Sequence, residues 1–208
     1  MDIDKLAPKV YLIDDDPIIL EVLKTLAESV GIQPQLYSNA RDFLNGYRHY
    51  PEECVVSDIR MPNISGLQLQ KILQERFSVP PPLILVTGHA EISAAVEAMK
   101  QGAFDFVEKP ISGQHFLDKI QAGLALSKNL HQQRLQQSAQ EAQIALLTPK
   151  EKQILTEVLE GHSSKEIAAD LGLSVRTVEN HRSRMMEKLR VKSTVELVKR
   201  FASYVPEH

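Results

Sequence analysis

Polar side chains suited to ion or phosphate chemistry directly follow several short apolar runs in the first half of the sequence. They are Asp14 and Asp15 after the first run, Asp58 after the third, Thr87 after the fourth and Lys109 after the fifth. Clustered carboxylates repel one another, and this repulsion favours a hard divalent cation. With no Cys or His nearby, the set suits Mg²⁺, which shares phosphate oxygens. The pattern indicates a reactive carboxylate, Asp58, beside a Mg²⁺ site.

The elements that must position these residues follow from the spacing of the apolar residues. Short runs rich in strand-forming residues alternate with stretches of helical spacing. Strands are predicted over 9–13, 34–37, 54–57, 82–86 and 104–107, with helices near 17–30, 40–47, 67–73 and 92–100 and from 113 onward. This alternation predicts a parallel sheet covered by helices on both faces. Ligands bind such sheets outside the carboxyl ends of the strands, where the polar residues fall.

Each polar residue also has a simpler interpretation when it is taken singly. Asp14 and Asp15 could form a solvated acidic turn, and Asp16, before Pro17, suits a helix cap. Thr87 could be an ordinary strand-end hydroxyl, and Lys109 a solvated surface lysine. Their shared position at one end of successive strands favours a common site over these separate interpretations.

The residues from 8 to 124 resemble a response-regulator receiver domain. The resemblance rests on the pair Asp14-Asp15, the D-x-x-M-P-x-x-x-G run from Asp58 to Gly66, Thr87, and Lys109-Pro110 after an aromatic strand. It implies a flavodoxin-like fold with strand order 2-1-3-4-5. It also implies that a sensor histidine kinase transfers a phosphoryl group to Asp58.

The resemblance further assigns roles around Asp58. Mg²⁺ would be bound by Asp15, Asp58 and the Arg60 carbonyl, with Asp14 contributing through water. Lys109 would stabilise the phosphoryl charge, as positioned cations do in phosphoryl transfer.

Two residues of the resemblance concern the switch that follows phosphorylation. Thr87 would move toward the phosphoryl group, and Phe106 would fill the space that it leaves. From the residues alone, Phe106 is nearly as well explained as a core aromatic. The resemblance also suggests a cis peptide before Pro110, whereas the sequence offers only the raised odds of any X-Pro bond.

Charge and cysteine content bound the class of protein. The chain has 208 residues, enough for two modest domains, and a net charge of −3. Residues 1–148 carry 13 Lys and Arg against 18 Asp and Glu, whereas residues 149–208 carry 11 against 9. A single cysteine, Cys54, permits neither an intrachain disulfide nor a cysteine metal cluster. With an acidic N-terminus and no apolar run near membrane-spanning length, we expect a soluble cytoplasmic protein.

A glutamine-rich stretch joins the two halves. Residues 132–143 include six glutamines, and no Pro or Gly interrupts 124–147. High helix propensity with a thin apolar stripe predicts an exposed helical linker over 125–147 that extends the fifth helix. A flexible tether remains an alternative, whereas the broken heptad counts against a coiled coil.

The last 61 residues, 148–208, have the capping signals of four short helices. Thr148 and Ser163 each stand three residues before a Glu, and Ser174 and Ser193 precede further helical stretches. The second and third helices are joined by a short turn around Gly172, which is typical of a helix-turn-helix. The third helix holds most of the basic charge. Its outward face is predicted to carry Arg176, Glu179, Asn180, Ser183 and Arg184. A solvated basic face is the simpler alternative, but the helix-turn-helix context favours DNA.

This second half resembles the LuxR-type DNA-binding domain of the NarL/FixJ response regulators. The matching runs are Leu147–Glu151, Lys165–Ala168, Leu171–Ser174, Thr177–His181 and Lys188-Leu189. The resemblance implies that Glu179, Asn180 and Ser183 face bases. It implies that Lys165, Thr177, His181, Arg184 and Lys188 face phosphates. Glu179 departs from the lysine common nearby, which leaves the preferred base open.

Together the two halves predict a phosphorylation-switched transcriptional activator rather than an enzyme. The expected partners are the sensor histidine kinase, double-stranded promoter DNA, RNA polymerase and a second copy of the chain, since phosphorylated receivers would pair on a two-fold DNA site. One rival is an atypical receiver that acts as a protein-interaction module without phosphate. Another is a flavodoxin-like enzyme or nucleotide binder, against which the lack of a glycine-rich loop after the first strand counts.

Overall fold

The computed structural model describes residues 7–88, 92–202 and 204, and the chain divides into two compact units after Gln132. The acidic N-terminal residues, on which the expectation about a signal peptide depends, lie outside the described residues. None of the described helices is both long enough and apolar enough to cross a membrane.

Among the described residues of the first unit, five parallel strands form one sheet in the order β2-β1-β3-β4-β5. The strands are β1 (Lys9–Ile13), β2 (Gln35–Tyr37), β3 (Glu53–Asp58), β4 (Leu83–Thr87) and β5 (Asp105–Glu108). In the register, Ile13 lies beside Ser57, Asp58 beside Val86, and Thr87 beside Glu108. The expected order is confirmed, and the register brings the carboxyl ends of β1, β3, β4 and β5 to one edge.

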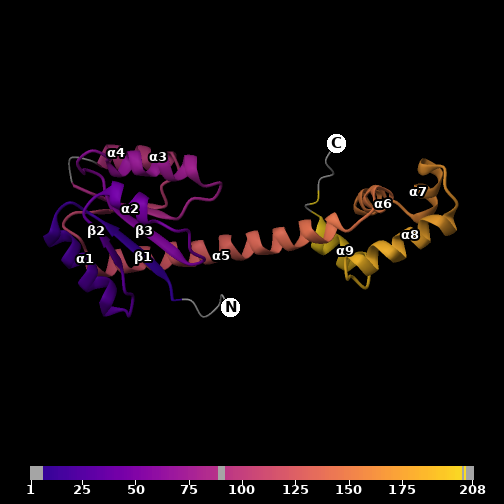
Figure 1. Ribbon diagram of the computed structural model, residues 1–208, viewed down its shortest axis with the longest axis horizontal. Coiled ribbons are helices and arrows are strands. Elements are labelled where there is room, and N and C mark those ends of the chain that lie inside the picture. Colours follow the sequence, from indigo (N-terminus) through magenta and orange to yellow (C-terminus); the bar gives the residue numbers. More distant parts are fainter. Residues whose placement is uncertain (1–6, 89–91, 203, 205–208) are drawn as a thin grey trace. The chain divides into compact units, whose positions relative to one another are not determined.

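Helices cover both faces of this sheet (Figure 1). They are α1 (Pro17–Ser29), α2 (Ala40–Gly46), α3 (Gly66–Arg76), α4 (Ile92–Lys100) and α5 (Gly113–Ala145). Alternate residues of β1 point to opposite faces of the sheet and join two different hydrophobic cores. Tyr11 packs with Phe43 of α2 and Leu69 of α3, whereas Leu12 packs with Leu23 of α1 and Phe116 of α5. Burial on both faces explains why the strands are continuous apolar runs without polar alternation.

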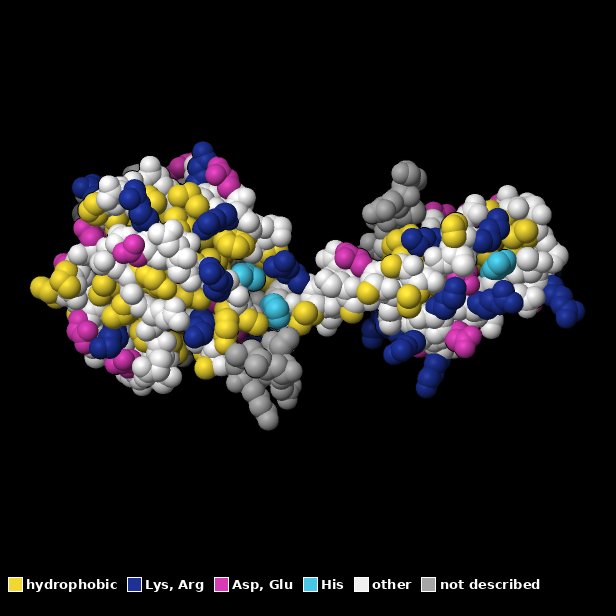
Figure 2. Space-filling model, viewed as in Figure 1, with side chains coloured by type: hydrophobic (Ala, Val, Ile, Leu, Met, Phe, Trp, Pro, Cys, Tyr) yellow, Lys and Arg dark blue, Asp and Glu magenta, His cyan; other side chains and the backbone are white. Residues whose placement is uncertain are grey.

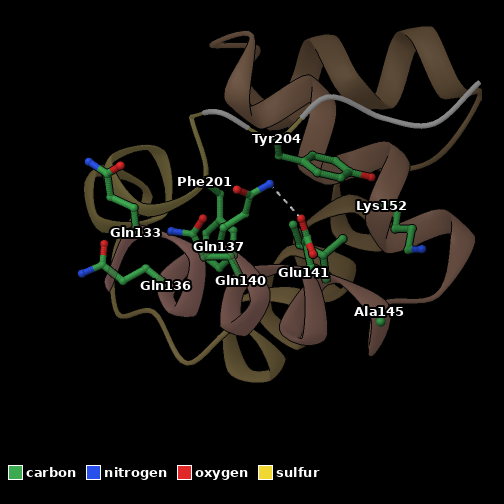
Figure 3. A pocket seen from close by; sticks show the side chains of 10 residues that line it. Gln133, Gln136, Gln137, Gln140, Glu141, Ala145, Lys152, Phe201 and Tyr204 are labelled. Atoms are coloured by element: carbon green, nitrogen blue, oxygen red, sulfur yellow. Dashed lines mark hydrogen bonds between the residues drawn. The ribbon is translucent and has the colours of Figure 1, made fainter. Parts of the chain in front are cut away.

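Helix α5 runs without a break from Gly113 to Ala145 and therefore passes from the first unit into the second. The part of the predicted linker from 125 to 145 is thus helical. Gln140 donates to the Arg200 carbonyl at 2.7 Å, and Gln143 accepts from Arg200 at 3.0 Å. These two glutamines, which belong to the second unit, thus tie the end of α5 to Arg200 within that unit. Some of the glutamines of α5 also line a pocket of about 800 Å³ together with Phe201 and Tyr204 (Figure 3).

The described residues of the second unit add four helices to the end of α5. They are α6 (Pro149–Leu159), α7 (Ser164–Leu171), α8 (Val175–Lys188) and α9 (Thr194–Phe201). The capping boxes Thr148–Glu151 and Ser163–Glu166 form as expected. Gly172 has the left-handed φ of +63° at the turn between α7 and α8. The inward residues of α8 join one core with Ile154, Leu197 and Phe201.

Candidate functional sites

Asp58, the last residue of β3, has only 6% of its surface exposed. Its Oδ1 accepts a hydrogen bond from Lys109 Nζ at 2.6 Å, and its Oδ2 accepts one from the Arg60 backbone N–H at 2.6 Å. The same Lys109 ammonium lies 3.3 Å from Oδ2 of Asp14, which is 1% exposed. One ammonium therefore joins two buried carboxylates that arrive from different strands.

Burial and charge act against each other in this group. Burial raises the pKa of the Asp14 carboxyl, although the Asp16 N–H and the Lys109 ammonium lower it, and the net shift is upward. Burial lowers the pKa of Lys109, but the hydrogen bond to Asp58 and the charges of both carboxylates raise it more. Lys109 therefore stays protonated at neutral pH. When Asp14 and Asp58 are both ionised, one ammonium leaves an excess of negative charge that a cation could balance.

The remaining residues predicted for this site lie around the same edge. Thr87 ends β4, is fully buried, and donates its hydroxyl hydrogen to the Gly88 carbonyl at 3.0 Å. Asp15 is exposed beside Asp14. Phe106 lies beside Leu85 in the register and is half-buried against the core that α2, α3 and α4 cover. The Lys109–Pro110 peptide is cis, as the resemblance implied.

Gly66 has a role that motif spacing alone did not explain. A Cβ atom at this position would lie 2.4 Å from the Asp58 carbonyl oxygen and 3.1 Å from the Asp58 carbonyl carbon. The Gly66 N–H also donates to the Ile59 carbonyl at 3.0 Å. The start of α3 is therefore packed directly against the end of β3, and only a residue without a side chain fits there.

In the second unit, the expected outward face of α8 is exposed. Its exposed residues are Arg176, Glu179, Asn180, Ser183 and Arg184, and Lys165 on α7 is exposed as well. Val178 and Met185 are buried on the opposite side of α8. Thr177 and His181 are half-buried at the border between the two faces. Figure 2 shows Lys and Arg side chains gathered over α8 and α9.

Lys188 is engaged differently from the other residues of the predicted DNA face. Its Nζ lies 2.7 Å from Oε2 of Glu151, and only 2% of the Glu151 surface is exposed. Burial raises the pKa of Glu151, but its bonds to Lys188 and Thr148 outweigh burial and hold that pKa below the usual range. The ammonium of Lys188 thus serves an internal ion pair, with which a DNA phosphate would have to compete.

Arg182, to which the sequence analysis gave no role, also makes contacts within the second unit. Its Nη1 donates to Ser164 Oγ and its Nη2 to Thr194 Oγ1, both at 3.3 Å. The side chain therefore ties the first residues of α7 and α9 to α8. The long gaps in sequence between these partners, and the hydroxyl groups involved, give no pattern from which the contact could have been predicted.

The two halves of the sequence match two protein families. Residues 10–121 match the response regulator receiver domain, and residues 145–201 match the bacterial regulatory proteins of the luxR family. The transcriptional regulatory protein TdiR of Thauera aromatica is 38% identical, over 92% of this chain and 84% of that protein. FixJ of Azorhizobium caulinodans is 40% identical, over 91% of this chain and 90% of that protein.

Solved structures of response regulators are also similar to this chain. The structure of the response regulator StyR is matched with a TM-score of 0.81 and 36% identity, over 96% of this chain and all of that chain. Full-length FixJ from B. japonicum is matched with a TM-score of 0.57 and 34% identity, over 93% of this chain and 95% of that chain.

Proposed function

Because the chain belongs to the response regulators of transcription that join a receiver domain to a LuxR-type DNA-binding domain, we propose that Asp58 is its phosphoryl acceptor. The observation that carries this proposal is the contact of 2.6 Å between Lys109 Nζ and Asp58 Oδ1 at the carboxyl edge of the sheet. A sensor histidine kinase is the proposed donor. A carboxylate oxygen of Asp58 attacks phosphorus in line, the bond from phosphorus to the donor nitrogen breaks, and the pair of electrons of that bond stays on the donor.

The residues at this edge fit a divalent cation of the Mg²⁺ type. Asp14 and Asp58 are buried with a single ammonium between them, and Asp15 is exposed at the same edge. Oxygen ligands and an excess of negative charge are what Mg²⁺ prefers. We propose that Asp15, Asp58 and the Arg60 carbonyl hold the ion and that Asp14 binds it through water. The bound ion supplies positive charge near the phosphoryl oxygens.

Lys109 supplies fixed positive charge for the same oxygens. Its ammonium already lies within hydrogen-bonding distance of Asp58, so it needs little reorganisation when charge develops. Once the phosphoryl group is attached, it carries about −1.5 to −2 charges and requires new hydrogen bonds. We propose that the Thr87 hydroxyl leaves the Gly88 carbonyl for this group and that Phe106 turns inward.

The output of this switch is DNA binding by the second unit. The exposed amide, hydroxyl and guanidinium groups on α8 suit base edges and phosphates in the major groove. We propose that Glu179, Asn180 and Ser183 contact bases and that Lys165, Arg176 and Arg184 contact phosphates. We also assign phosphate contacts to Thr177 and His181, which lie at the border of the exposed face of α8. Lys188 would contact a phosphate after its ammonium leaves Glu151. Phosphorylated chains pair as homodimers on promoter DNA in the cytoplasm and recruit RNA polymerase.

The test uses a small phosphodonor with Mg²⁺ and the full chain. Intact-mass measurement should detect one phosphoryl group on the parent protein and none on Asp58→Asn. Asp16→Asn is the matched control, since it removes an acid from the same edge while Asn still caps α1. Labelling of Asp58→Asn to the extent of the parent would contradict the acceptor assignment. Labelling that leaves dimerisation and promoter binding unchanged would favour the interaction-module alternative.

A further inference from the structure

Three side chains in the second unit come together around the end of α6. Glu157 lies on α6, His162 in the turn after it, and Asp170 on α7. One ligand atom from each lies within 4.8 Å of the other two. His162 Nδ1 is 2.8 Å from Glu157 Oε2, and a further carboxylate oxygen, from Glu160, is 3.8 Å from the same nitrogen.

The backbone fixes the position of the imidazole. Gly161 has a φ of +94° and donates to the Val158 carbonyl at 3.1 Å. The next residue, His162, donates its N–H to the Glu157 carbonyl at 3.0 Å. The turn therefore returns His162 over the last turn of α6, where its ring meets the Glu157 side chain. Only a residue that tolerates a left-handed conformation permits this turn.

A surface ion pair between His162 and Glu157 is the simpler explanation, but it does not account for the position of Asp170 beside them. Such a pair needs only one carboxylate and contributes little to stability when it is exposed. Glu166 also faces His162, but we do not count it as a ligand. Its carboxylate accepts a hydrogen bond from the Ser163 N–H at 2.7 Å and so caps α7. Glu157 and Asp170 come from different helices and flank one imidazole. This is an arrangement of one nitrogen and two oxygen donors, and not only a group of acids.

We propose that Glu157, His162 and Asp170 bind a divalent cation of the borderline class, such as Zn²⁺ or Ni²⁺. Imidazole and carboxylate ligands suit these ions, whereas Mg²⁺ and Ca²⁺ prefer all-oxygen sites and Cu⁺ prefers sulfur. Bonds of roughly 2.0–2.2 Å require the side chains to close by about an ångström around the ion. Water or Glu160 completes the coordination. The ion joins the end of α6 to α7, the helix that precedes the turn into α8.

Binding should be measured by equilibrium dialysis of the untagged full-length protein against ZnCl₂ or NiCl₂. Saturating Mg²⁺ is present to occupy the acidic edge of the receiver. We expect one ion per chain on the parent, and an affinity at least tenfold lower for His162→Gln, Glu157→Gln and Asp170→Asn. His115→Gln is the matched control, because His115 is exposed on α5 in the first unit. Equal binding by the parent and His162→Gln, or a parent affinity weaker than millimolar, overturns the proposal.

A second readout separates a lost ligand from a lost fold. The imidazole signals of His162 should shift on addition of Zn²⁺ in NMR spectra of the folded parent, while those of His115 stay in place. Because the metal binds neutral imidazole, it competes with a proton. Glu157, Glu160 and Glu166 raise the pKa of His162. The affinity should therefore fall as pH is lowered through that pKa, and an affinity independent of pH overturns His162 as a ligand.

Discussion

Lys188 Nζ on α8 lies 2.7 Å from Glu151 Oε2 on α6, and this pair joins the predicted DNA-reading helix to a helix cap. The Glu151 carboxylate also accepts from the Thr148 N–H at 2.8 Å, so one buried group closes the capping box and receives the ammonium. The pair sets where the C-terminal end of α8 lies against α6. A lysine expected at the DNA surface therefore also has a structural role.

Loss of this pair should destabilise the second unit. Lys188→Ala leaves the Glu151 carboxylate buried with one partner fewer. Since the Lys188 side chain is 36% exposed, we expect a loss of about 1–2 kcal/mol, between the values for exposed and for buried pairs. The free energy of unfolding can be followed by urea titration of amide signals in α8. Lys150→Ala, in an exposed contact with Gln153, is the control and should change it by less than about 0.5 kcal/mol. Unchanged stability in Lys188→Ala would show that the pair is dispensable.

The same pair predicts how stability of the second unit depends on pH. The pKa of Glu151 is lower in the folded chain than in the unfolded chain, where it is about 4.3. The folded state therefore gains stability from Glu151 above that value and loses it as pH falls through the lower, folded pKa. Urea midpoints measured from pH 7 down to pH 3 should fall more steeply for the parent than for Glu151→Gln. Parallel curves would contradict this source of stability.

The meeting of Asp58 with Lys109 could be predicted from the sequence, whereas that of Glu151 with Lys188 could not. Parallel strands bring their carboxyl ends to one edge whatever the details of packing, so a polar residue after each apolar run is enough. The contact between α6 and α8 depends on how two helices cross, and no spacing encodes that crossing. Glu151 was expected only as half of a capping box.

The limits of the strands show a smaller difference of the same kind. The apolar pattern predicts strands that end before Asp58 and Thr87, but both residues belong to β3 and β4. Backbone pairing continues past the last apolar side chain, as the register of Asp58 with Val86 shows. Hydrophobicity reports which side chains are buried, whereas the length of a strand follows its hydrogen bonds.

Removal of the Lys109 charge should slow phosphorylation of Asp58. Lys109→Ala deletes a donor that lies 2.6 Å from the acceptor carboxylate, and loss of one such charge-stabilising group costs about 10²-fold or more in rate. The initial rate of labelling by a small phosphodonor measures this effect. Lys119→Ala, which removes a lysine paired with Asp105 away from Asp58, should label at nearly the parent rate. Equal rates for Lys109→Ala and the parent would exclude Lys109 from the reaction.

Gly66→Ala should disturb the acceptor site without changing any charge. The added methyl group would lie 2.4 Å from the Asp58 carbonyl oxygen, so β3 and α3 must separate. We expect a loss of about 1–3 kcal/mol in unfolding free energy and slower labelling. Gly46→Ala is the control, since its nearest neighbour, the Tyr37 hydroxyl, is 3.4 Å away. Stability of Gly66→Ala equal to that of Gly46→Ala would contradict the close approach.

Two variants on the second unit should separate base contacts from phosphate contacts. Asn180 is exposed on the outward face of α8, so Asn180→Ala should lower affinity for the preferred site by about 1–3 kcal/mol and leave random DNA almost unchanged. Lys165→Ala should weaken both DNAs about equally. It should also reduce the slope of log K against log salt by about 0.9, because one phosphate contact is lost.

Lys71→Ala is the control for these DNA measurements, since it removes the same charge from a side chain that is 78% exposed in the first unit. Its affinity and salt slope should match those of the phosphorylated parent. The comparison requires all variants to be phosphorylated to the same extent, so that dimerisation does not differ among them. If Asn180→Ala and Lys165→Ala both retain the parent affinity, α8 is not the element that reads DNA. Binding would then depend neither on the predicted base contact of Asn180 nor on the predicted phosphate contact of Lys165.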